Sequence, residues 1–303
     1  MTRKSRGLVA CVLCVVAALH IAGRGTSGAI VDGTQTSSSR AEPWTAAILV
    51  KPAFYRAKKL PVPPEAKDRL LCGGSLIAPQ WVLTAGHCIG VVDARYLTIV
   101  LGRRVLSSTA KGEHHDFVAP ALVHPKFAIA RPDSCGLSYP VYDAALLELA
   151  EPASQTPIPL AQGADWNAWG DGKSVRVWGW GQTTNPPGPR DDCGKRISLR
   201  PLEPKPSNVL KHAKMTMRDR GFREYAFLAG RGTGDDAGSP CYGDSGGGVT
   251  IGAYGQRKLV GVVSAGPNCA RRSSRYAKVG RTNKPDPGRG GPLYEWIDRK
   301  VFG

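Results

Sequence analysis

Short apolar runs recur along the whole chain and are separated by glycine, proline, asparagine and aspartate. Several runs alternate between apolar and polar positions, which is the two-residue period of a strand with one buried face. Because strands do not alternate with long helices, the pattern predicts an all-β protein of the sandwich or barrel type. The expected strands span residues 44–50, 71–77, 81–85, 96–101, 117–123, 144–149, 175–181, 248–251 and 259–264.

The remaining segments indicate one helix and three surface loops. Residues 293–301 follow a proline and read as a short C-terminal helix. Residues 51–69 are rich in lysine and proline, residues 182–207 in proline and arginine, and residues 281–292 in glycine and proline. Such compositions favour loops over regular elements.

The composition agrees with a folded protein built from strands and turns. The 303 residues are 42% hydrophobic and 21% charged, which excludes a disordered or collagen-like chain. Glycine (37 residues) and proline (24) are frequent and methionine (3) is rare, which suits many turns. The length corresponds either to two domains or to one large fold built from strands.

Residues 1–29 have the organisation of a secretory signal peptide. Three basic residues within the first six precede an almost wholly apolar run at residues 7–23. Small residues at 27–29 suit cleavage after Ala29. The alternative is a membrane anchor, but the apolar run is at the short limit for crossing a bilayer. We therefore expect a secreted chain without a transmembrane anchor.

Removal of the signal changes the counts of charge and cysteine. The whole chain has 41 Lys and Arg against 24 Asp and Glu, a formal charge of +17, and four of the positive charges lie in residues 1–29. A chain of 274 residues with a charge of +13 and six cysteines remains. The basic surplus favours anionic partners. An even number of cysteines in an exported chain predicts up to three disulfides.

Three short motifs carry the candidate chemistry. Thr-Ala-Gly-His-Cys places His87 at the end of an apolar strand, Asp143 heads another apolar run, and Gly-Asp-Ser-Gly-Gly places Ser245 in a glycine-rich turn. A serine becomes nucleophilic when an imidazole takes its proton, and a carboxylate orients that imidazole. Alone, the histidine also reads as a packed core residue and the aspartate as a turn residue. The serine motif is far more specific.

With these motifs in the order His, Asp, Ser, the chain resembles the secreted chymotrypsin/trypsin-like serine proteases from Ile30 to its end. Further matching segments are Ile-Val-Asp-Gly at 30–33, Cys-Gly-Gly-Ser-Leu-Ile at 72–77, Val-His-Pro at 123–125, Trp-Gly-Trp-Gly at 178–181 and the closing segment 294–297. The resemblance implies two six-stranded antiparallel β-barrels with the active site between them and a short C-terminal helix. The protease domain would span residues 30–303, with its two halves meeting near residues 150–170.

The resemblance also implies roles for individual residues. His87 is the expected general base, Asp143 its orienting acid and Ser245 the nucleophile. The backbone N–H groups of Gly243 and Ser245 are the expected oxyanion hole. No cofactor is expected, and no metal either, because adjacent residues of the histidine-rich segment 113–116 point to opposite faces of a strand.

Three disulfides are expected in the mature chain, two of them from the resemblance and the third by exclusion. The pairs are Cys72–Cys88 beside the histidine, Cys241–Cys269 beside the specificity pocket, and Cys135–Cys193 because these two cysteines remain.

Family members become active when a new N-terminal amine folds inward and pairs with the aspartate before the nucleophile, which here implies Ile30 and Asp244. A buried carboxylate without a partner is costly, so the oxyanion turn is expected to be distorted until the amine arrives. Ala29 stands where zymogens usually carry a basic residue. Either signal peptidase generates Ile30 directly, or an earlier cut after Ala22 or Gly23 is followed by trimming.

The residue at the base of the specificity pocket predicts a non-tryptic preference. Ser239 stands two residues before Cys241, where tryptic members carry an aspartate. Asp236 lies three residues too early, although a shift of the loop would bring it closer. Because a charged substrate side chain needs an opposite charge in a desolvated pocket, we expect an uncharged, apolar residue before the scissile bond.

Other pocket positions depart from the family pattern. Ser264 and Gly266 match the strand that pairs with substrate, but Ala265 between them replaces a tryptophan. Ser274 replaces the glycine at the back of the pocket. The loop 269–276 also carries three arginines, and an arginine reaching inward is the competing interpretation, since it would select acidic substrate residues.

A second class of function is a catalytically weak or inactive relative that binds anionic surfaces through its basic loops. Every triad position is filled, which favours the enzyme. The chain has no recognisable nucleic-acid reading motif, so no specific nucleic-acid partner is expected. The expected partners are protein or peptide substrates together with anionic surface contacts, and the expected state is a monomer.

Overall fold

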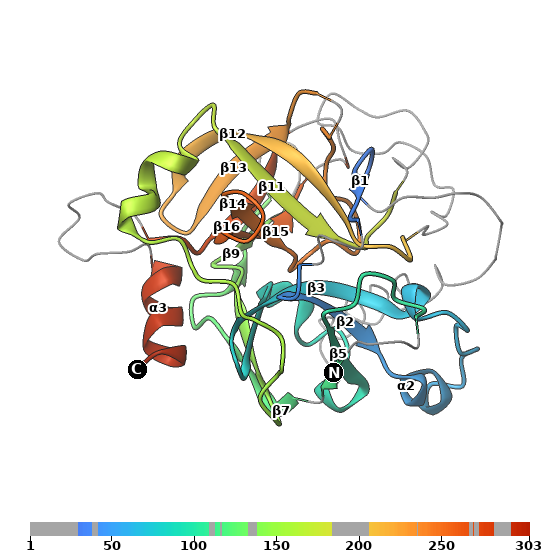
Figure 1. Cartoon of the computed structure of the whole chain (residues 1–303). Helices are drawn as coiled ribbons and strands as arrows, with labels where there is room; N and C mark the ends of the chain where they lie inside the picture. Colours follow the sequence, from blue (N-terminus) through green and yellow to red (C-terminus); the bar gives the residue numbers. More distant parts are fainter. Residues whose placement is uncertain are drawn as a thin grey trace.

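The structure is a computed structural model, and its strands form two large antiparallel sheets, one above the other in Figure 1, with a small third sheet of two strands. A short helix closes the chain, so the predicted all-β class with a C-terminal helix is confirmed. The described residues are 30–37, 42–108, 113–115, 117–132, 138–183, 206–234, 236–266, 269, 273–281 and 292–303.

The first sheet is built from the N-terminal half of the chain and has the strand order β6-β5-β2-β3-β4-β10-β7. It is the curved half-barrel in the lower part of Figure 1. Apolar side chains from these strands form one buried cluster. Its strands are β2 (Thr45–Val50), β3 (Leu70–Ala78), β4 (Trp81–Thr84), β5 (Leu97–Leu101), β6 (Glu113–His115), β7 (Phe117–Val123) and β10 (Ala145–Leu149).

The second sheet closes into a six-stranded barrel in the order β12-β11-β14-β15-β16-β13, because β13 also pairs with β12. Strand β1 comes from the N-terminus and adds to the outer edge of β12, as the blue arrow in the upper part of Figure 1 shows. The strands are β1 (Thr34–Gln35), β11 (Ser174–Gly179), β12 (Lys211–Arg223), β13 (Ala226–Arg231), β14 (Gly248–Ile251), β15 (Lys258–Ala265) and β16 (Ser274–Lys278).

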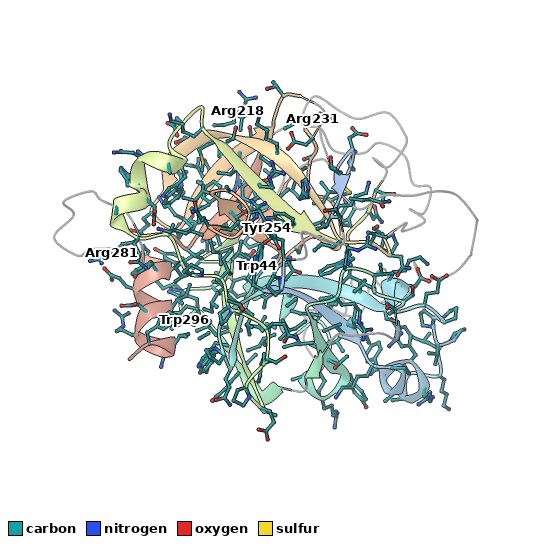
Figure 2. All side chains as sticks on the ribbon, viewed as in Figure 1. Trp44, Arg218, Arg231, Tyr254, Arg281 and Trp296 are labelled. Carbon is teal, nitrogen blue, oxygen red and sulfur yellow. A yellow bond between two sulfur atoms is a disulfide. The ribbon has the colours of Figure 1, made fainter. Side chains whose placement is uncertain are left out.

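Three of the barrel strands, β12, β13 and β16, were not expected from the apolar pattern. In β12 the buried residues Ala213, Met215 and Met217 alternate with outward-facing residues, several of them basic. Figure 2 shows Arg218 of this strand and Arg231 of β13 on the outer side of the barrel. The two-residue period is therefore present, but the basic residues of the outer face hide it from a search for apolar runs.

The helices have separate supporting roles. Helix α3 (Pro292–Val301) confirms the expected C-terminal helix and packs its Trp296 against His124 at a centroid distance of 5.1 Å. Helix α2 (Pro52–Ala57) lies within the segment expected to be a loop, so that part of the loop prediction was wrong. The helix forms because Pro52 starts it and its Phe54 ring packs on Tyr96 at 5.6 Å. No helix among the described residues is long and apolar enough to span a membrane.

Short elements complete the connections between strands. Strands β8 (Ala128–Ile129) and β9 (Pro140–Val141) pair in the small sheet, directly before Asp143. The short 3-10 helices are η2 (Ala66–Arg69), η3 (Gly86–Cys88), η4 (Ala94–Tyr96) and η5 (Gly163–Trp169).

The two sheets meet through buried aromatic residues. Trp44, next to β2, packs edge to face on Trp178 of β11 with the ring centroids 5.9 Å apart. Both rings are almost fully buried, and Figure 2 places Trp44 at the junction of the two halves. This contact fixes the N-terminal sheet against the barrel, and the candidate site is assembled from residues of both halves.

Candidate active site

His87 and Asp143 meet because two paired strands bring them to the same end of the first sheet. His87 lies in η3 just after β4, and Asp143 lies just before β10. The two strands are antiparallel, with Thr84 of β4 opposite Ala145 of β10. The residues that follow one strand and precede the other are therefore neighbours, although they are 56 positions apart.

The His87–Asp143 contact is a double hydrogen bond that fixes the imidazole. The His87 Nδ1 atom lies 2.7 Å from Asp143 Oδ2, and the His87 backbone N–H donates to Oδ1 at 2.8 Å. The Asp143 side chain is only 2% exposed, whereas the His87 side chain is 27% exposed. A buried carboxylate thus holds one ring nitrogen and leaves the other edge of the ring accessible to a substrate.

Ser264 adds a third group to this pair. Its hydroxyl donates to Asp143 Oδ2 at 2.5 Å from strand β15 of the barrel. The sequence placed Ser264 only among the substrate-binding positions. Because 121 residues separate the two partners, no local pattern could have revealed the contact. The structure therefore assigns this serine a contact with the aspartate that had not been expected.

The turn that carries Ser245 is held against both sheets. The Gly73 N–H of β3 donates to the Ser245 carbonyl at 2.7 Å, and the Gly246 N–H donates to the Val263 carbonyl of β15 at 2.8 Å. At Gly73 a side chain would stand only 2.9 Å from the Gly247 Cα, so the backbones approach as closely as glycine allows. Ser245 is thus placed at the junction of the two halves.

A disulfide connects the histidine to the same strand that holds the serine turn. Cys72 and Cys88 are bonded, with their Cα atoms 6.3 Å apart, as expected from the sequence. Cys88 follows His87 directly, and Cys72 directly precedes Gly73, the donor to Ser245. The residues expected to form the triad are therefore connected through strand β3. The disulfide joins this strand to the histidine turn, and Gly73 joins it to the serine turn. The three groups Cys72, His87 and Cys88 lie within 4.8 Å, but both thiols are consumed in the disulfide and cannot bind a metal.

The backbone of the serine turn has the form of an anion cradle. Gly243 has φ +89°, a conformation that residues with a side chain rarely adopt. Within the described residues, the N–H groups of Gly243 and Ser245 donate to no acceptor, whereas the N–H of Asp244 between them donates to Cys241 at 3.0 Å. Two free backbone N–H groups, one of the serine itself and one two residues before it, are the kind of donors that an oxyanion requires.

Asp244 is completely buried behind this turn. Its carboxylate accepts hydrogen bonds from the Gly181 N–H at 2.8 Å and the Cys241 N–H at 2.9 Å. Burial raises the pKa of Asp244 to about 7, although the two backbone hydrogen bonds oppose the rise. In the part of the chain that the structure describes, this carboxylate forms no ion pair.

The start of the expected mature chain lies beside this region. Ile30 is fully buried, and Val31 exchanges backbone hydrogen bonds with Ser239, at 3.0 and 3.1 Å. Ser239 precedes the serine turn by a few residues. Residues 1–29 lie outside the described part of the chain, so the expected signal peptide and the Ile30–Asp244 pair stay predictions.

The serines of the expected specificity pocket are buried and uncharged. Ser239 is 1% exposed, and its hydroxyl has no hydrogen-bond partner within the described residues. The Ser274 hydroxyl lies against Gly266, 2.4 Å from where a Cβ would stand. The disulfide Cys241–Cys269 is present as expected, with the Cα atoms 4.7 Å apart.

Asp236, the alternative recognition acid, is engaged elsewhere. Its carboxylate forms an ion pair of 2.8 Å with Arg176 of β11, and its carbonyl accepts from the Lys214 N–H at 2.7 Å. These contacts fix the residue away from Ser239 and oppose the loop shift considered above. The remaining expected disulfide, Cys135–Cys193, lies outside the described residues.

Comparisons with known proteins agree with this geometry. Residues 30–284 match the family model described as Trypsin. The chain is 31% identical over 261 residues to vitamin K-dependent protein C of Mus musculus, covering 83% of the chain and 49% of that protein. It is 31% identical over 226 residues to tryptase of Mus musculus, covering 69% of the chain and 74% of that protein. It is 29% identical over 213 residues to trypsin of Saccharopolyspora erythraea, covering 69% of the chain and 82% of that protein.

The match spans about half the length of the two protein C sequences, from Mus musculus and Rattus norvegicus. The family model places the shared domain at residues 30–284.

Proposed function

The chain belongs to the trypsin family of serine proteases, and from this membership we propose that it is a secreted endopeptidase acting through Ser245, His87 and Asp143. The observation that carries the proposal is the 2.7 Å contact of His87 Nδ1 with the buried Asp143, on the same framework that holds the Ser245 turn.

The proposed reaction begins with attack of the Ser245 hydroxyl on a peptide carbonyl. The free nitrogen of His87 takes the hydroxyl proton, and Asp143 stabilises the imidazolium that forms. His87 then gives the proton to the leaving amine, which leaves an acyl group on Ser245. A water molecule, deprotonated by the same imidazole, releases the second product.

The free N–H groups of Gly243 and Ser245 support the transition state in this proposal. As backbone donors without an acceptor among the described residues, they are available to a carbonyl oxygen on which negative charge develops. Loss of one such donor typically lowers turnover by about 10²–10³-fold. The two free donors and a histidine oriented by a buried carboxylate favour the enzyme over the anionic-surface binder.

We propose an apolar or uncharged residue before the scissile bond. The buried Ser239 supplies no carboxylate, and Asp236 is committed to Arg176. A lysine or arginine of a substrate would then lose its hydration without gaining an opposite charge. Ser274, which lies against Gly266, supplies no charge either.

We propose that the amine of Ile30 activates the site by pairing with Asp244. The buried carboxylate with its raised pKa is the group that needs a cation, and Ile30 is itself buried beside Ser239 through Val31. Secretion is supported by the basic and apolar pattern of residues 1–29 and by two disulfides, which persist in oxidising compartments. N-terminal sequencing of secreted protein tests both points, because a stable active species that begins before Ile30 excludes the pairing.

The experiment that tests the function is cleavage of a diverse peptide mixture by the purified chain beginning at Ile30. We expect cleavage after uncharged residues, identified by mass spectrometry, and none by the Ser245→Ala variant. Cleavage that persists in Ser245→Ala overturns the assignment of the nucleophile, and cleavage confined to lysine and arginine overturns the proposed specificity. A folded chain that cleaves nothing overturns the enzyme.

A further inference from the structure

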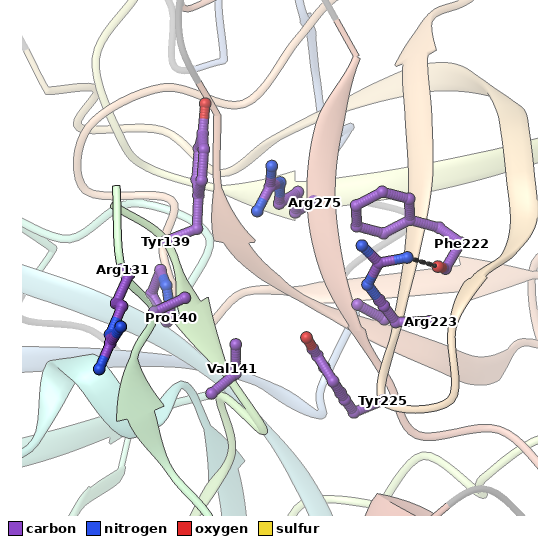
Figure 3. Close-up of a pocket in the computed structure, with 10 residues that line it drawn as sticks. Arg131, Tyr139, Pro140, Val141, Phe222, Arg223, Tyr225 and Arg275 are labelled. Carbon is purple, nitrogen blue, oxygen red and sulfur yellow. Dashed lines mark hydrogen bonds between the residues drawn. The ribbon is translucent and has the colours of Figure 1, made fainter. Parts of the chain in front are cut away.

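A second pocket lies directly beside the candidate active site. It has a volume of about 190 Å³ and is shown in Figure 3. One wall comes from Tyr139, Pro140 and Val141 of the segment that precedes Asp143, and the other from Phe222 and Arg275 of the barrel. A cavity of roughly 150 Å³ is enough to hold benzene, so this pocket has room for one side chain.

Each wall of the pocket contains a residue close to one partner of the Ser264–Asp143 hydrogen bond. Val141 stands two residues before Asp143. Arg275 of β16 lies opposite Ala265 of β15, the residue that follows Ser264. A polypeptide bound at Ser245 therefore needs to extend only a short distance along this edge to place another side chain in the pocket.

Arg275 is held in place by aromatic rings instead of a carboxylate. Its guanidinium carbon lies 3.4 Å from the ring centroid of the buried Tyr139 and 5.3 Å from that of Phe222. Figure 3 shows the side chain between these two rings. Stacking fixes the plane of a guanidinium and leaves its N–H groups at the edge free to donate.

The pocket gathers positively charged side chains. Arg131, Arg223 and Arg275 line it, and none of its described lining residues is an aspartate or glutamate. Among the described residues none of these three arginines forms an ion pair, and the nearby Glu224 accepts a hydrogen bond from the Tyr142 hydroxyl.

Other arginines of the same chain do have carboxylate partners. The described pairs include Arg176 with Asp236, Arg231 with Asp32 and Arg257 with Glu42. Unlike Arg176, Arg231 and Arg257, the three arginines of the pocket have no carboxylate partner among the described residues. A concave, partly aromatic site with fixed guanidinium donors matches an anion carried on a short apolar stem.

We propose that this pocket binds the carboxylate side chain of a substrate, so that the enzyme prefers glutamate or aspartate at a position removed from the scissile bond. The inference rests on the proposed function, because it names a second feature of the substrate for that site. This proposal differs from the earlier alternative, in which an arginine reaches into the specificity pocket. Arg275 stacks on Tyr139. The serines Ser239 and Ser274 of the specificity pocket carry no charge.

The test compares peptides that differ only by glutamate or glutamine. Starting from a peptide that the enzyme cleaves, the residues two, three and four positions before the bond, and two after it, are changed one at a time. We expect kcat/KM to favour glutamate by about 10-fold at one position, the usual effect of a hydrogen bond to a charged group. Arg275→Gln removes that preference.

A matched control separates the pocket from general charge. Arg281 is exposed, and its guanidinium carbon lies 6.0 Å from the Tyr294 ring, so Arg281→Gln also removes one positive charge beside an aromatic ring. This variant should keep the full glutamate preference. Should Arg275→Gln fold poorly, Arg223→Gln at an exposed position of the pocket should reduce the preference without affecting the fold.

The outcomes distinguish this inference from the proposed function. Hydrolysis with equal kcat/KM for glutamate and glutamine at every position overturns the pocket assignment and leaves the protease intact. A preference that survives both Arg275→Gln and Arg223→Gln also overturns it. Should no peptide be hydrolysed, the proposed function fails, and the relative affinity of the same peptides for the Ser245→Ala chain, measured by fluorescence polarisation, decides the pocket alone.

Discussion

The Ser264 hydroxyl donates a hydrogen bond of 2.5 Å to the Asp143 carboxylate, which joins the barrel to the half-barrel at the candidate active site. The same carboxylate oxygen also contacts His87 Nδ1 at 2.7 Å. Asp143 is thus oriented from two sides, by the backbone of the His87 turn and by a strand of the other half. The orientation of the histidine therefore depends on the docking of the two halves.

Ser264→Ala should lower kcat by about 10-fold while leaving the fold intact, because it removes one hydrogen bond to a charged group. The measurement is kcat and KM on a cleaved peptide, together with the rate of Ser245 modification by a fluorophosphonate. Ser75→Ala is the matched control, since the Ser75 hydroxyl is equally buried and has no hydrogen-bond partner within the described residues. Equal losses in the two variants would show that Ser264 acts only through packing.

Asp244 should make stability depend on pH before the mature N-terminus is formed. Its pKa is about 7 in the folded chain and near 3.8 when unfolded, so between these values the folded state holds a proton that the unfolded state has lost. Stability therefore falls as the pH rises from about 4 to 7, by at most about 1.4 kcal/mol per pH unit. Above pH 7 the dependence ends.

The measurement is urea unfolding across this pH range for a chain in which a residue precedes Ile30. Asp244→Asn should abolish the slope, and a chain that begins at Ile30 should show a smaller slope, because its amine stabilises the ionised carboxylate. A slope that is the same in all three chains would rule out Asp244 as its source.

Ser239→Asp should shift the preference toward lysine and arginine. The new carboxylate would stand at a position that is 1% exposed, so it also lowers the thermal midpoint of unfolding when no cationic substrate is bound. The ratio of kcat/KM for an arginine peptide to that for a leucine peptide should rise by about 10-fold or more. Asp236→Asn serves as the comparison and should leave the ratio unchanged, because that acid pairs with Arg176. A fall of the ratio in Asp236→Asn would identify Asp236 as the recognition acid.

Loss of the Cys72–Cys88 disulfide should cost both stability and activity. The bridge closes a loop with a sequence separation of 16, which corresponds to about 3 kcal/mol of unfolding free energy. The Cys72→Ala, Cys88→Ala double variant should also react more slowly with a fluorophosphonate at temperatures where it is folded, because His87 loses its connection to β3. Unchanged reactivity in the folded variant would mean that the disulfide has no part in positioning the histidine.

The sequence was sufficient to predict His87 and Asp143, because each motif stands at the end of an apolar strand. The His87 and Asp143 motifs end and begin apolar strands, and an antiparallel pairing of such strands brings them together. The contact of Ser264 with Asp143 needed the docking of two sheets, which no local pattern contains.

Strands with a basic outer face were missed for a physical reason. In β12 the buried Ala213, Met215 and Met217 are small or unbranched, and the outward positions lower the average hydropathy. Helix α2 was missed because its buried Phe54 and Tyr55 are only two apolar positions in a basic segment. The pocket around Arg275 depends on the register that places it opposite Ala265, and that register includes an irregularity between Val263 and Ala265.

The most direct test of the central claim is labelling of the intact chain beginning at Ile30 with a fluorophosphonate, followed by mass spectrometry of the modified peptide. The account predicts one label per molecule on Ser245, with the rate greatly reduced in His87→Ala and Asp143→Asn. A folded, disulfide-bonded chain that leaves Ser245 unlabelled, or labels it equally fast in His87→Ala, would contradict the account.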